Sequence, residues 1–517
     1  MAKRAQPVSA GPGYGAAGFL AALVLGTLAA VAWRAETGGG LSAADWAAVR
    51  FTILQASLSA LISVGLAIPV ARALARRRFA GRSALIALLG VPFILPVIVA
   101  ILGLLEVFGR AGWISSLLGT FGFDPIRIYG LHGVVLAHVF LNLPLATRLI
   151  LQGWQEVPAE RFRLAAQLGF DAPAMFRLIE WPLLRQVIPG ALAVVFAICL
   201  TSFAVALTLG GGPKATTIEL GIYQAFRFEF DLGRAALLSG LQILIATAAA
   251  MVAIRLAQGT GFGTGLDRSL RRWDGRTTIA RTTDTVWIAL AAAFLLLPLG
   301  AIVASGVPGF AGLPFVVWKA AGVSLLVATA STLLLLLAAL PMAAAIATGR
   351  HSIEVAGLLG LAASPLVIGT GLFILIRPIA DPFLLALPVT ALVNALMSLP
   401  FAMRILVPRA RDIVERYGKL GLSLDMAHGP FLWRVFLPRM RAQIGFAAGL
   451  GMALSIGDLG VITLFADPDI ATLPLQIYRL MGSYQMEAAA GGALLLLLLS
   501  VGTFWLLDRG GRYHAEV

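Results

Sequence analysis

Charged residues are scarce in this sequence. Asp, Glu, Lys and Arg together make up 12% of its 517 residues, whereas 59% of the residues are hydrophobic. Soluble domains carry about twice this share of charge, so the composition excludes an ordinary soluble enzyme or binding module. Apolar runs of about 20 residues recur along the chain, and a helix of that length crosses a bilayer. The sequence therefore predicts an all-α, polytopic membrane protein.

Cysteine and histidine are also rare. The single cysteine, Cys199, excludes an intramolecular disulfide, and the five histidines do not have the spacing of a metal site. The glycine-rich stretch Gly210–Lys214 lacks the G-x-x-x-x-G-K-S/T pattern of a phosphate-binding loop. We therefore predict no catalytic residue, no metal and no cofactor, and we expect a separate polypeptide to carry out any ATP hydrolysis.

Twelve apolar runs are long enough to be membrane spans, and they form two sets of six. The first set is 16–33, 51–73, 84–108, 131–151, 187–209 and 235–254; the second is 285–305, 322–347, 355–376, 384–406, 444–465 and 488–507. A polar, basic linker, 258–283, separates the sets. We therefore expect two six-helix domains, 1–257 and 284–517, related as parallel repeats.

The net charge of +14 has two explanations. A basic chain can bind nucleic acid, but Lys and Arg also accumulate in the cytoplasmic loops of membrane proteins. With a cytoplasmic N-terminus and twelve spans, 29 of the 39 Lys and Arg residues fall on the cytoplasmic side and 10 fall outside. This bias favours the second explanation. It predicts cytoplasmic N- and C-termini and no nucleic-acid partner.

A polar, arginine-rich segment follows the fourth run of each set. The first polar segment is Gln155–Gly190 and the second is Pro408–Gly445, with Pro438 lying 256 positions after Pro182. In the first, we expect a helix over 159–168 that ends at a left-handed Gly169. A short basic helix with an apolar face fits a groove on another protein or the lipid surface. The duplication favours docking on a protein.

Three polar side chains within or beside the apolar runs are candidates for lining a path through the membrane. A carboxylate at membrane depth is costly and marks a functional candidate, and Asp458 lies inside the eleventh run. Asn142 and Asn394 lie in the fourth and tenth runs, where an amide can also serve as a hydrogen bond between helices.

The two polar segments resemble the coupling loop of bacterial ABC importer permeases, whose pattern is E-A-A-x3-G-x9-I-x-L-P. In the first segment the matching residues are Ala165, Gly169, Ile179 and Pro182. In the second segment Leu437 and Pro438 match, Val435 is a conservative change, and Asp425 replaces the glycine. The resemblance implies that both segments contact the ATPase, and that the second segment is the degenerate one.

Within that superfamily the chain is similar, over nearly its whole length, to the fused, two-domain thiamine/thiamine pyrophosphate permeases. The most specific stretches are LAHVFLNLPLATRL (Leu136–Leu149), FRLIEWPLLR (Phe176–Arg185) and LSIGDLGVITLF (Leu454–Phe465). The resemblance implies two type I ABC permease halves in a bacterial inner membrane, surrounded by lipid.

The same resemblance implies the partners: a dimer of a separate ABC ATPase, a periplasmic thiamine-binding protein, and thiamine or thiamine pyrophosphate in transit. Fused iron(III) importer permeases, or those for another small solute, share the architecture and stay open as an alternative. A self-contained secondary transporter with twelve spans is a more remote alternative, because it would not need the repeated polar segments.

Overall fold

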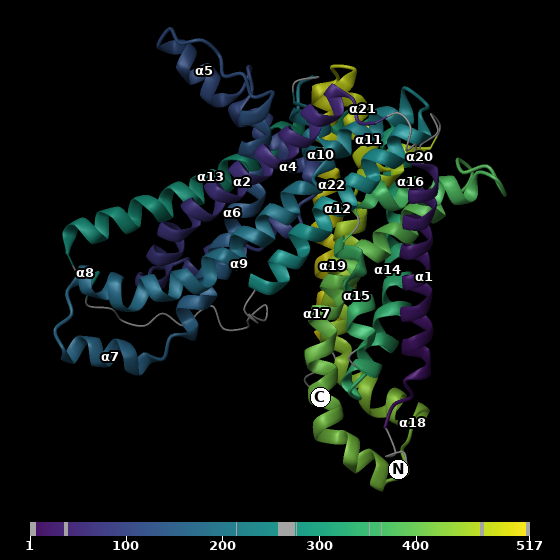
Figure 1. Ribbon diagram of the computed structural model, residues 1–517. Coiled ribbons are helices and arrows are strands. Elements are labelled where there is room, and N and C mark those ends of the chain that lie inside the picture. The colour runs from purple at the N-terminus through teal and green to yellow at the C-terminus, as the bar shows by residue number, and fades with distance from the viewer. Residues whose placement is uncertain are drawn as a thin grey trace.

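The computed structural model describes residues 7–35, 40–212, 215–256, 274–275, 277–350, 352–362, 364–465 and 470–512. These residues form helices and short connections, without a strand. The long helices assemble into two arms that meet at the upper end and diverge toward the lower end (Figure 1). Most of the expected linker, 258–283, lies outside the described residues.

Eleven helical segments are long and apolar enough to cross a membrane, which confirms the all-α, polytopic architecture. Single helices are α1 (Gly11–Arg34), α2 (Ala43–Arg76), α6 (Leu131–Glu156), α12 (Leu232–Leu256), α13 (Thr278–Ala311), α14 (Phe315–Ala347), α17 (Ala386–Ser423) and α22 (Met486–Arg512). Three further segments consist of consecutive helices. The first is α4 (Val97–Phe108) with α5 (Trp113–Thr120), and the second is α8 (Ala172–Met175), η2 (Phe176–Glu180) and α9 (Trp181–Leu200). The third is α18 (Gly429–Phe431), η4 (Leu432–Phe436), α19 (Leu437–Ile456) and α20 (Gly460–Phe465).

The ninth expected span, 355–376, is not one continuous helix. It is divided into α15 (Ser352–Ala362) and the short apolar helix α16 (Pro365–Ile376). Ser364 caps the second piece, because its hydroxyl accepts a hydrogen bond from the Val367 amide at 3.2 Å, and Pro365 suits a first helical position. The third expected span, 84–108, is divided in the same way into α3 (Arg82–Leu88), η1 (Val91–Phe93) and α4, with Pro96 before α4.

The first helix of each set packs on the helices of the other set. α1 packs along α14 and α16 as well as α12 of its own set, and α13 packs along α4 and α2 as well as α22 of its own set. Small residues allow these close contacts: a Cβ at Gly13 of α1 would lie 2.7 Å from the Pro341 carbonyl oxygen, and one at Gly103 of α4 would lie 2.6 Å from the Pro298 carbonyl oxygen. The first arm therefore consists of α2, α6, α9 and α13, and the second of α14, α17, α19 and α1.

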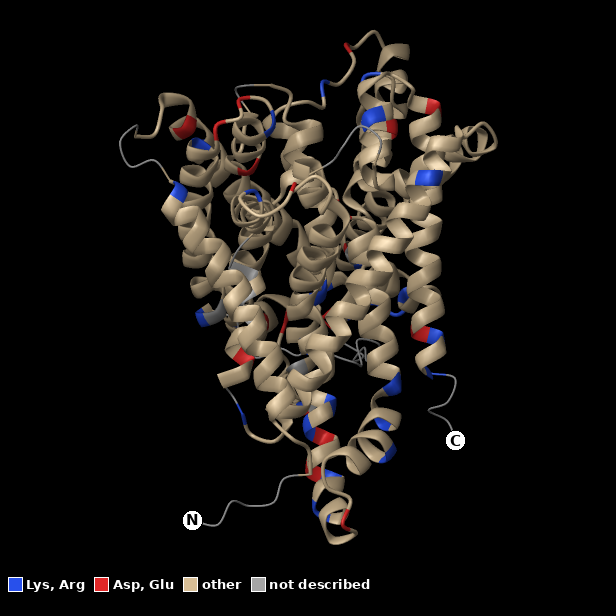
Figure 2. Ribbon diagram, turned by 90° about the vertical axis from the view of Figure 1, so that its right-hand side faces the viewer, with Lys and Arg blue, Asp and Glu red and all other residues tan. Residues whose placement is uncertain are grey.

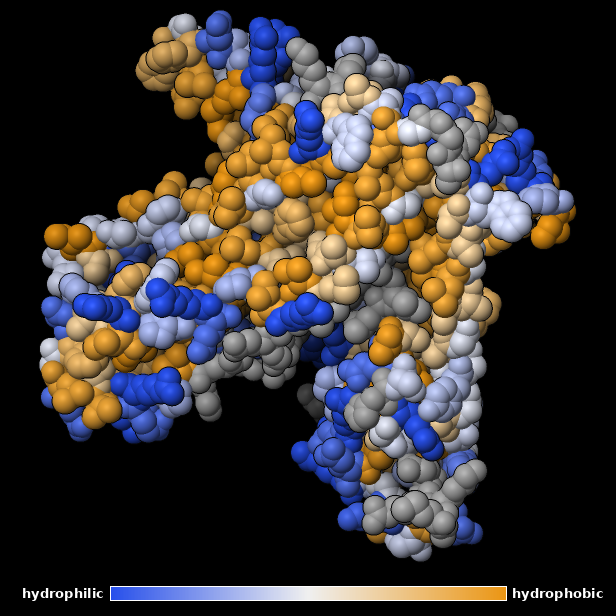
Figure 3. Space-filling view, viewed as in Figure 1, coloured by the Kyte–Doolittle hydropathy of each residue, from blue (hydrophilic) through white to orange (hydrophobic). Residues whose placement is uncertain are grey.

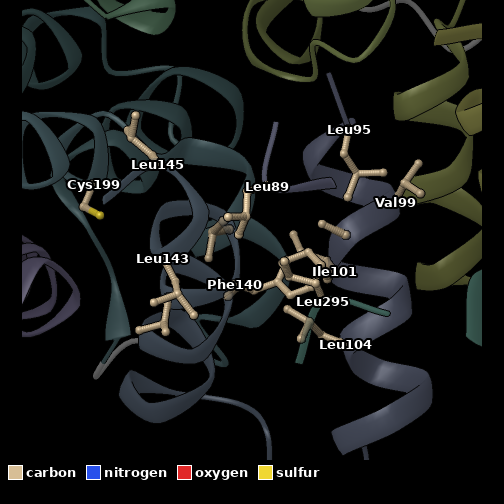
Figure 4. Packing of buried hydrophobic residues seen from close by; sticks show 14 of the residues in the cluster. Leu89, Leu95, Val99, Ile101, Leu104, Phe140, Leu143, Leu145, Cys199 and Leu295 are labelled. Carbon is tan, nitrogen blue, oxygen red and sulfur yellow. The ribbon is translucent and has the colours of Figure 1, made fainter. Parts of the chain in front are cut away.

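A large apolar core joins α13 to the first arm. Figure 4 shows Leu295 of α13 beside Ile101 and Leu104 of α4 and Phe140 of α6. All four side chains are buried, and the Phe140 and Phe294 rings meet edge-to-face with their centroids 5.7 Å apart. Such edge-to-face pairs add to the stabilisation by apolar burial. The exchanged helix is thus an integral part of the arm on which it packs.

Two short helices at the upper end are held by matching hydrogen bonds. The Thr52 hydroxyl of α2 accepts from the Ile218 amide at the start of α11 (Ile218–Arg227), at 2.9 Å. The Ser324 hydroxyl of α14 accepts from the Leu473 amide at the start of α21 (Leu473–Gly482), at 2.8 Å. Each hydroxyl accepts a hydrogen bond from an amide that would otherwise have no partner at the start of a helix. The repeated residues of the two halves therefore make the same structural contact.

The surface separates apolar sides from polar ends. Charged residues concentrate toward the two ends of the long helices (Figure 2). Figure 3 shows hydrophobic residues over the sides of the body, hydrophilic residues over the lower ends of both arms, and a wide hollow between the arms. A continuous apolar side of this kind is the surface that a bilayer covers.

Candidate functional site

The first polar segment forms two short helices joined by a turn at the lower end of the first arm (Figure 1). α7 covers Ala159–Gln167, close to the predicted 159–168, and Gly169 has φ +68°, which confirms the predicted left-handed turn. The Gly169 amide donates to the Ala166 carbonyl at 3.1 Å, and the Phe170 amide donates to the Ala165 carbonyl at 3.0 Å. These two bonds define a Schellman motif.

The predicted motif residues of this segment share a small core. Ala165 is buried together with Val157, Phe162 and Met175, and Ile179 packs against that cluster. A larger side chain in place of Ala165 would disturb this packing. Pro182 is the second residue of α9 and directly follows η2. The glycine of the motif is therefore explained by the closing turn, and the alanine and the isoleucine by the small core.

A π-turn precedes the span in both arms. In the first it is η2, where the Trp181 amide donates to the Phe176 carbonyl; in the second it is η4, where the Leu437 amide donates to the Leu432 carbonyl. The two turns lie 256 positions apart, directly before Pro182 and Pro438. Because a proline cannot continue the regular hydrogen-bond ladder, the chain widens by one residue at the same place in both copies.

The second polar segment begins differently from the first. α17 continues through the expected end of its span to Ser423, whereas α6 ends at Glu156 and α7 starts after Pro158. Val414 stands 256 positions after Pro158, so no proline interrupts the helix there. The helix therefore continues for 17 residues beyond Leu406, the expected end of the apolar run, into the polar segment.

The second segment nevertheless closes with the same turn. Asp425, which stands where Gly169 stands in the first copy, has φ +55°. Its amide donates to the Leu422 carbonyl at 3.2 Å, and the Met426 amide donates to the Gly421 carbonyl at 2.8 Å. Aspartate tolerates the left-handed region better than most residues, so the loss of glycine from the sequence motif did not remove the turn.

Apolar side chains are exposed at matching places on both segments. Leu164 on α7 and Leu168 directly after it are 56% and 63% exposed, and Leu420 and Leu424, each 256 positions later, are 56% and 62% exposed. Val435 and Leu437 are instead partly buried against the core of the second arm, and Pro438 lies in the first turn of α19. Paired exposed leucines at the tips of otherwise hydrophilic arms indicate surfaces that a partner covers.

A buried ionic network lies behind the first polar segment. Glu180, the last residue of η2, is fully buried, and both Nε and Nη2 of Arg72 contact one of its carboxylate oxygens at 2.7 Å. Arg76 lies 3.7 Å from the other oxygen and 2.8 Å from Asp274. The sequence analysis did not predict this network. Two features of the sequence indicate it: the single acid Glu180 at the end of an apolar helix face, and the cluster of arginines at the end of α2.

Helices of the third and fifth spans of both sets are broken near one another. In the fifth spans, α9 ends at Leu200 before α10 (Phe203–Leu209), and α19 ends at Ile456 before α20. A Cβ on Gly457 would lie 2.9 Å from Pro96, the residue at the break before α4. Broken helices expose backbone dipoles inside a membrane and are typical of substrate paths. The breaks therefore mark the candidate path.

The three predicted path residues lie at these breaks. Asn142 donates to the Cys199 sulfur at 3.5 Å, and Asn394 donates to the Ser455 hydroxyl at 3.0 Å; Cys199 and Ser455 are 256 positions apart, just before the two breaks. The asparagines thus tie the fourth and tenth spans to the broken helices. Asp458 lies within the second break, where one carboxylate oxygen accepts from the Gly460 amide at 3.2 Å.

Asp458 has a carboxylate oxygen whose hydrogen-bonding capacity is unused. Its second carboxylate oxygen, Oδ2, is buried and has no hydrogen-bond donor among the residues that the structure describes. A buried acceptor without a donor is costly and is expected where a ligand or water supplies the missing partner. Asp458 is therefore a candidate for contact with a solute or a water.

Comparisons with known proteins place the chain in a family. No family model matches it. It is 40% identical over 530 residues, covering 98% of both chains, to the thiamine transport system permease protein ThiP of Escherichia coli, and 38% identical over 515 residues to that of Brucella abortus, covering 96% and 94%. A shorter match, 24% identical over 214 residues and 40% of this chain, is to the sulfate transport system permease protein CysW of Synechococcus elongatus. With its eleven candidate spans and this similarity over almost its full length, the chain belongs to the family of thiamine transport system permeases.

Proposed function

We propose that the chain is the permease subunit of an ABC importer that carries thiamine or thiamine pyrophosphate across a bacterial inner membrane. The paired turns at the tips of the two arms carry this proposal: each presents two exposed leucines, and the two sets are 256 positions apart. The solute is taken from the names of relatives that share about two fifths of their residues with the chain over nearly their full length.

The two arms imply two docking sites for a separate ATPase dimer. In this proposal the halves are 1–257 and 284–517, joined by the cytoplasmic linker 258–283, and both termini are cytoplasmic. The polar segments are coupling segments, with Leu164 and Leu168 on one arm and Leu420 and Leu424 on the other entering apolar grooves of the ATPases. Movement of the ATPases then changes the separation of the arms, which are the two-state element of the transporter.

The broken helices would form the solute path between the halves. Thiamine carries a positive thiazolium ring, and the free oxygen of Asp458 supplies an opposite charge at the break between α19 and α20. Asn142 and Asn394 hold the surrounding helices through Cys199 and Ser455. Selection of the solute rests mainly on a periplasmic thiamine-binding protein that delivers it to the upper end.

Uptake by reconstituted vesicles tests the proposal. Vesicles containing the permease and the ATPase are supplied with binding protein and labelled thiamine, and each component is omitted in turn. We expect uptake only when all components and ATP are present. Uptake of iron(III) or another solute in place of thiamine would overturn the substrate, and uptake driven by an ion gradient without the ATPase would overturn the ABC mechanism.

Docking is tested separately with matched substitutions. Replacing Leu168 or Leu424 by Gln removes an exposed apolar contact without changing the helix. We expect each variant to insert normally and to retain less ATPase on purification. Replacing Leu337, which is 72% exposed on the side of α14, by Ala is the control and should retain the ATPase fully. Equal retention in all variants would contradict docking at these leucines.

A further inference from the structure

The ionic network behind the first polar segment reaches beyond that segment. Arg76 contacts Asp274, which lies in the linker, at 2.8 Å, and it lies 4.0 Å from Asp284 of α13. Arg77 contacts Asp284 at 2.7 Å and donates to the Gly275 carbonyl at 2.7 Å. The network therefore joins three parts of the chain: the end of α2, the first polar segment through Glu180, and the stretch that leads into the second half.

The centre of the network is buried. Among the described residues, three arginines, Arg72, Arg76 and Arg77, contact three carboxylates, those of Glu180, Asp274 and Asp284. The side chains of Glu180 and Asp274 are 0% exposed, and that of Arg76 is 4% exposed. Removing one partner of such a network leaves the others buried without compensation. Hydrogen bonds between guanidinium and carboxylate groups are also directional. The network therefore fixes the orientation of the three parts of the chain as well as the distances between them.

The second arm has a corresponding contact, made by the stretch that leads into the first half. The Pro7 carbonyl, just before α1, accepts a hydrogen bond from the His428 amide of the second polar segment at 2.8 Å. A Cβ on Gly418 of α17 would lie 3.2 Å from Cγ of Pro7. Val8 is buried in the same apolar cluster as Phe431 and Phe436. Among the described residues, this contact is made by apolar side chains and backbone atoms.

From these contacts we propose that each polar segment is positioned by the leading stretch of the opposite half: the first by Asp274 and Asp284 through Arg76, and the second by Pro7 and Val8. Because α13 and α1 continue from these leads into the opposite arms, a displacement of either segment is passed to the first helix of the other half. Asp274, Arg76 and Pro7 are therefore positioning residues that keep the movements of the two arms together.

This inference rests on the proposed function, and its clearest readout is the number of ATP molecules hydrolysed per thiamine taken up. Asp274→Asn keeps the shape of the side chain but removes its charge, and Asp274→Glu restores the charge. In the reconstituted importer we expect the asparagine variant to bind the ATPase normally and to raise this ratio at least threefold, with the ratio lowered again by glutamate. An unchanged ratio in Asp274→Asn, or equal loss of folded protein in both variants, would overturn the positioning role.

A cysteine pair tests the second arm without removing a buried charge. The Cβ of Pro7 would lie 3.9 Å from a Cβ on Gly418, within the range for a disulfide. Pro7→Cys with Gly418→Cys, in a chain where Cys199 is alanine, allows the oxidised and reduced forms of one protein to be compared. We expect equal uptake from both forms, because the lead moves with the segment. Uptake blocked by oxidation and recovered with reductant would show that the contact opens during transport, contrary to the proposal.

The two levels of failure are distinguishable. If the wild-type chain shows no uptake that depends on ATP and binding protein, the proposed function fails before any ratio is compared. If the wild-type importer works and only the variant results differ from expectation, the positioning role alone is overturned.

Discussion

Gly169 offers a direct test of whether the closing turn of the first polar segment matters for docking. Its φ of +68° lies in the left-handed region, and a Cβ added there would meet no atom within 4 Å. A substitution at Gly169 therefore changes backbone preference without adding a clash. We expect the loss of ATPase affinity to follow the order Asn, Ala, Val, with Asn the mildest, because asparagine tolerates this region and a β-branched residue does not.

The size of the effect follows from the backbone energy. A non-glycine residue in the left-handed region costs roughly 1–2 kcal/mol, and asparagine costs less because it visits this region far more often. One to two kcal/mol is a factor of about 5–30 in an equilibrium, so Gly169→Ala should weaken ATPase binding by about that factor. The second copy supports the ranking, since Asp425 occupies the same turn at φ +55°.

The assay is the affinity of purified ATPase for each variant in lipid nanodiscs. Gly429→Ala is the matched control, because Gly429 begins α18 in the second polar segment without a left-handed φ and with open space around its Cβ position. It should bind like the wild type. The reasoning is refuted if the losses follow side-chain volume, so that Ala is milder than Asn, or if the control loses as much affinity as Gly169→Ala.

Two further predictions concern buried carboxylates. Asp458→Asn should slow thiamine uptake roughly tenfold, because it removes a charged contact of about 1.5 kcal/mol, and should leave ATPase binding normal. Unchanged uptake at an equal protein level would show that Asp458 has only a structural role. Burial raises the pKa of Glu219, which lies on α11 outside the candidate spans, from 4.5 to about 7. Between these two values the folded protein keeps a proton that the unfolded chain has released. The contribution of Glu219 to the free energy of unfolding should therefore be greatest below pH 4.5 and should fall as the pH rises through 7. Glu219→Gln, which keeps an acceptor for the Gln242 amide, should flatten the decline in melting temperature between pH 5 and pH 8, and an equal decline in both proteins would contradict this assignment.

Local backbone structure could be predicted from the sequence where a single residue determines it. Gly169 predicted its own left-handed turn, and the 256-residue offset predicted the second segment. The error in the ninth span has the same local origin. Ser364 and Pro365 together form a helix start within an apolar run, and hydropathy over a long window does not register such a restart.

Long-range pairing was not predictable in this way. Arg72 and Glu180 are 108 positions apart, and Arg76 and Asp274 are 198 apart, so no periodicity in the sequence connects them. The exchange of α1 and α13 between the arms escaped prediction for a related reason. In a bilayer, lipid is as apolar as a neighbouring helix, and hydropathy identifies a span without identifying its partner. Small residues such as Gly13 and Gly103 decide that partner through close backbone contact.

The two arms use different side chains to hold the π-turns η2 and η4 in place. Phe436 stands where Glu180 stands in the first arm and is equally buried, and Ala344 and Thr348 stand 272 positions after Arg72 and Arg76. A buried ion network is not more stabilising than well-packed apolar side chains, so stability does not explain the difference. Directional guanidinium contacts hold η2 in one orientation, whereas the apolar contacts around Phe436 resist separation but permit small shifts. We therefore expect the first polar segment to be the more rigid attachment. The second, whose sequence motif has drifted, keeps the closing turn, the π-turn and the exposed leucines, with apolar packing at Phe436 in place of the ion pairs of Glu180.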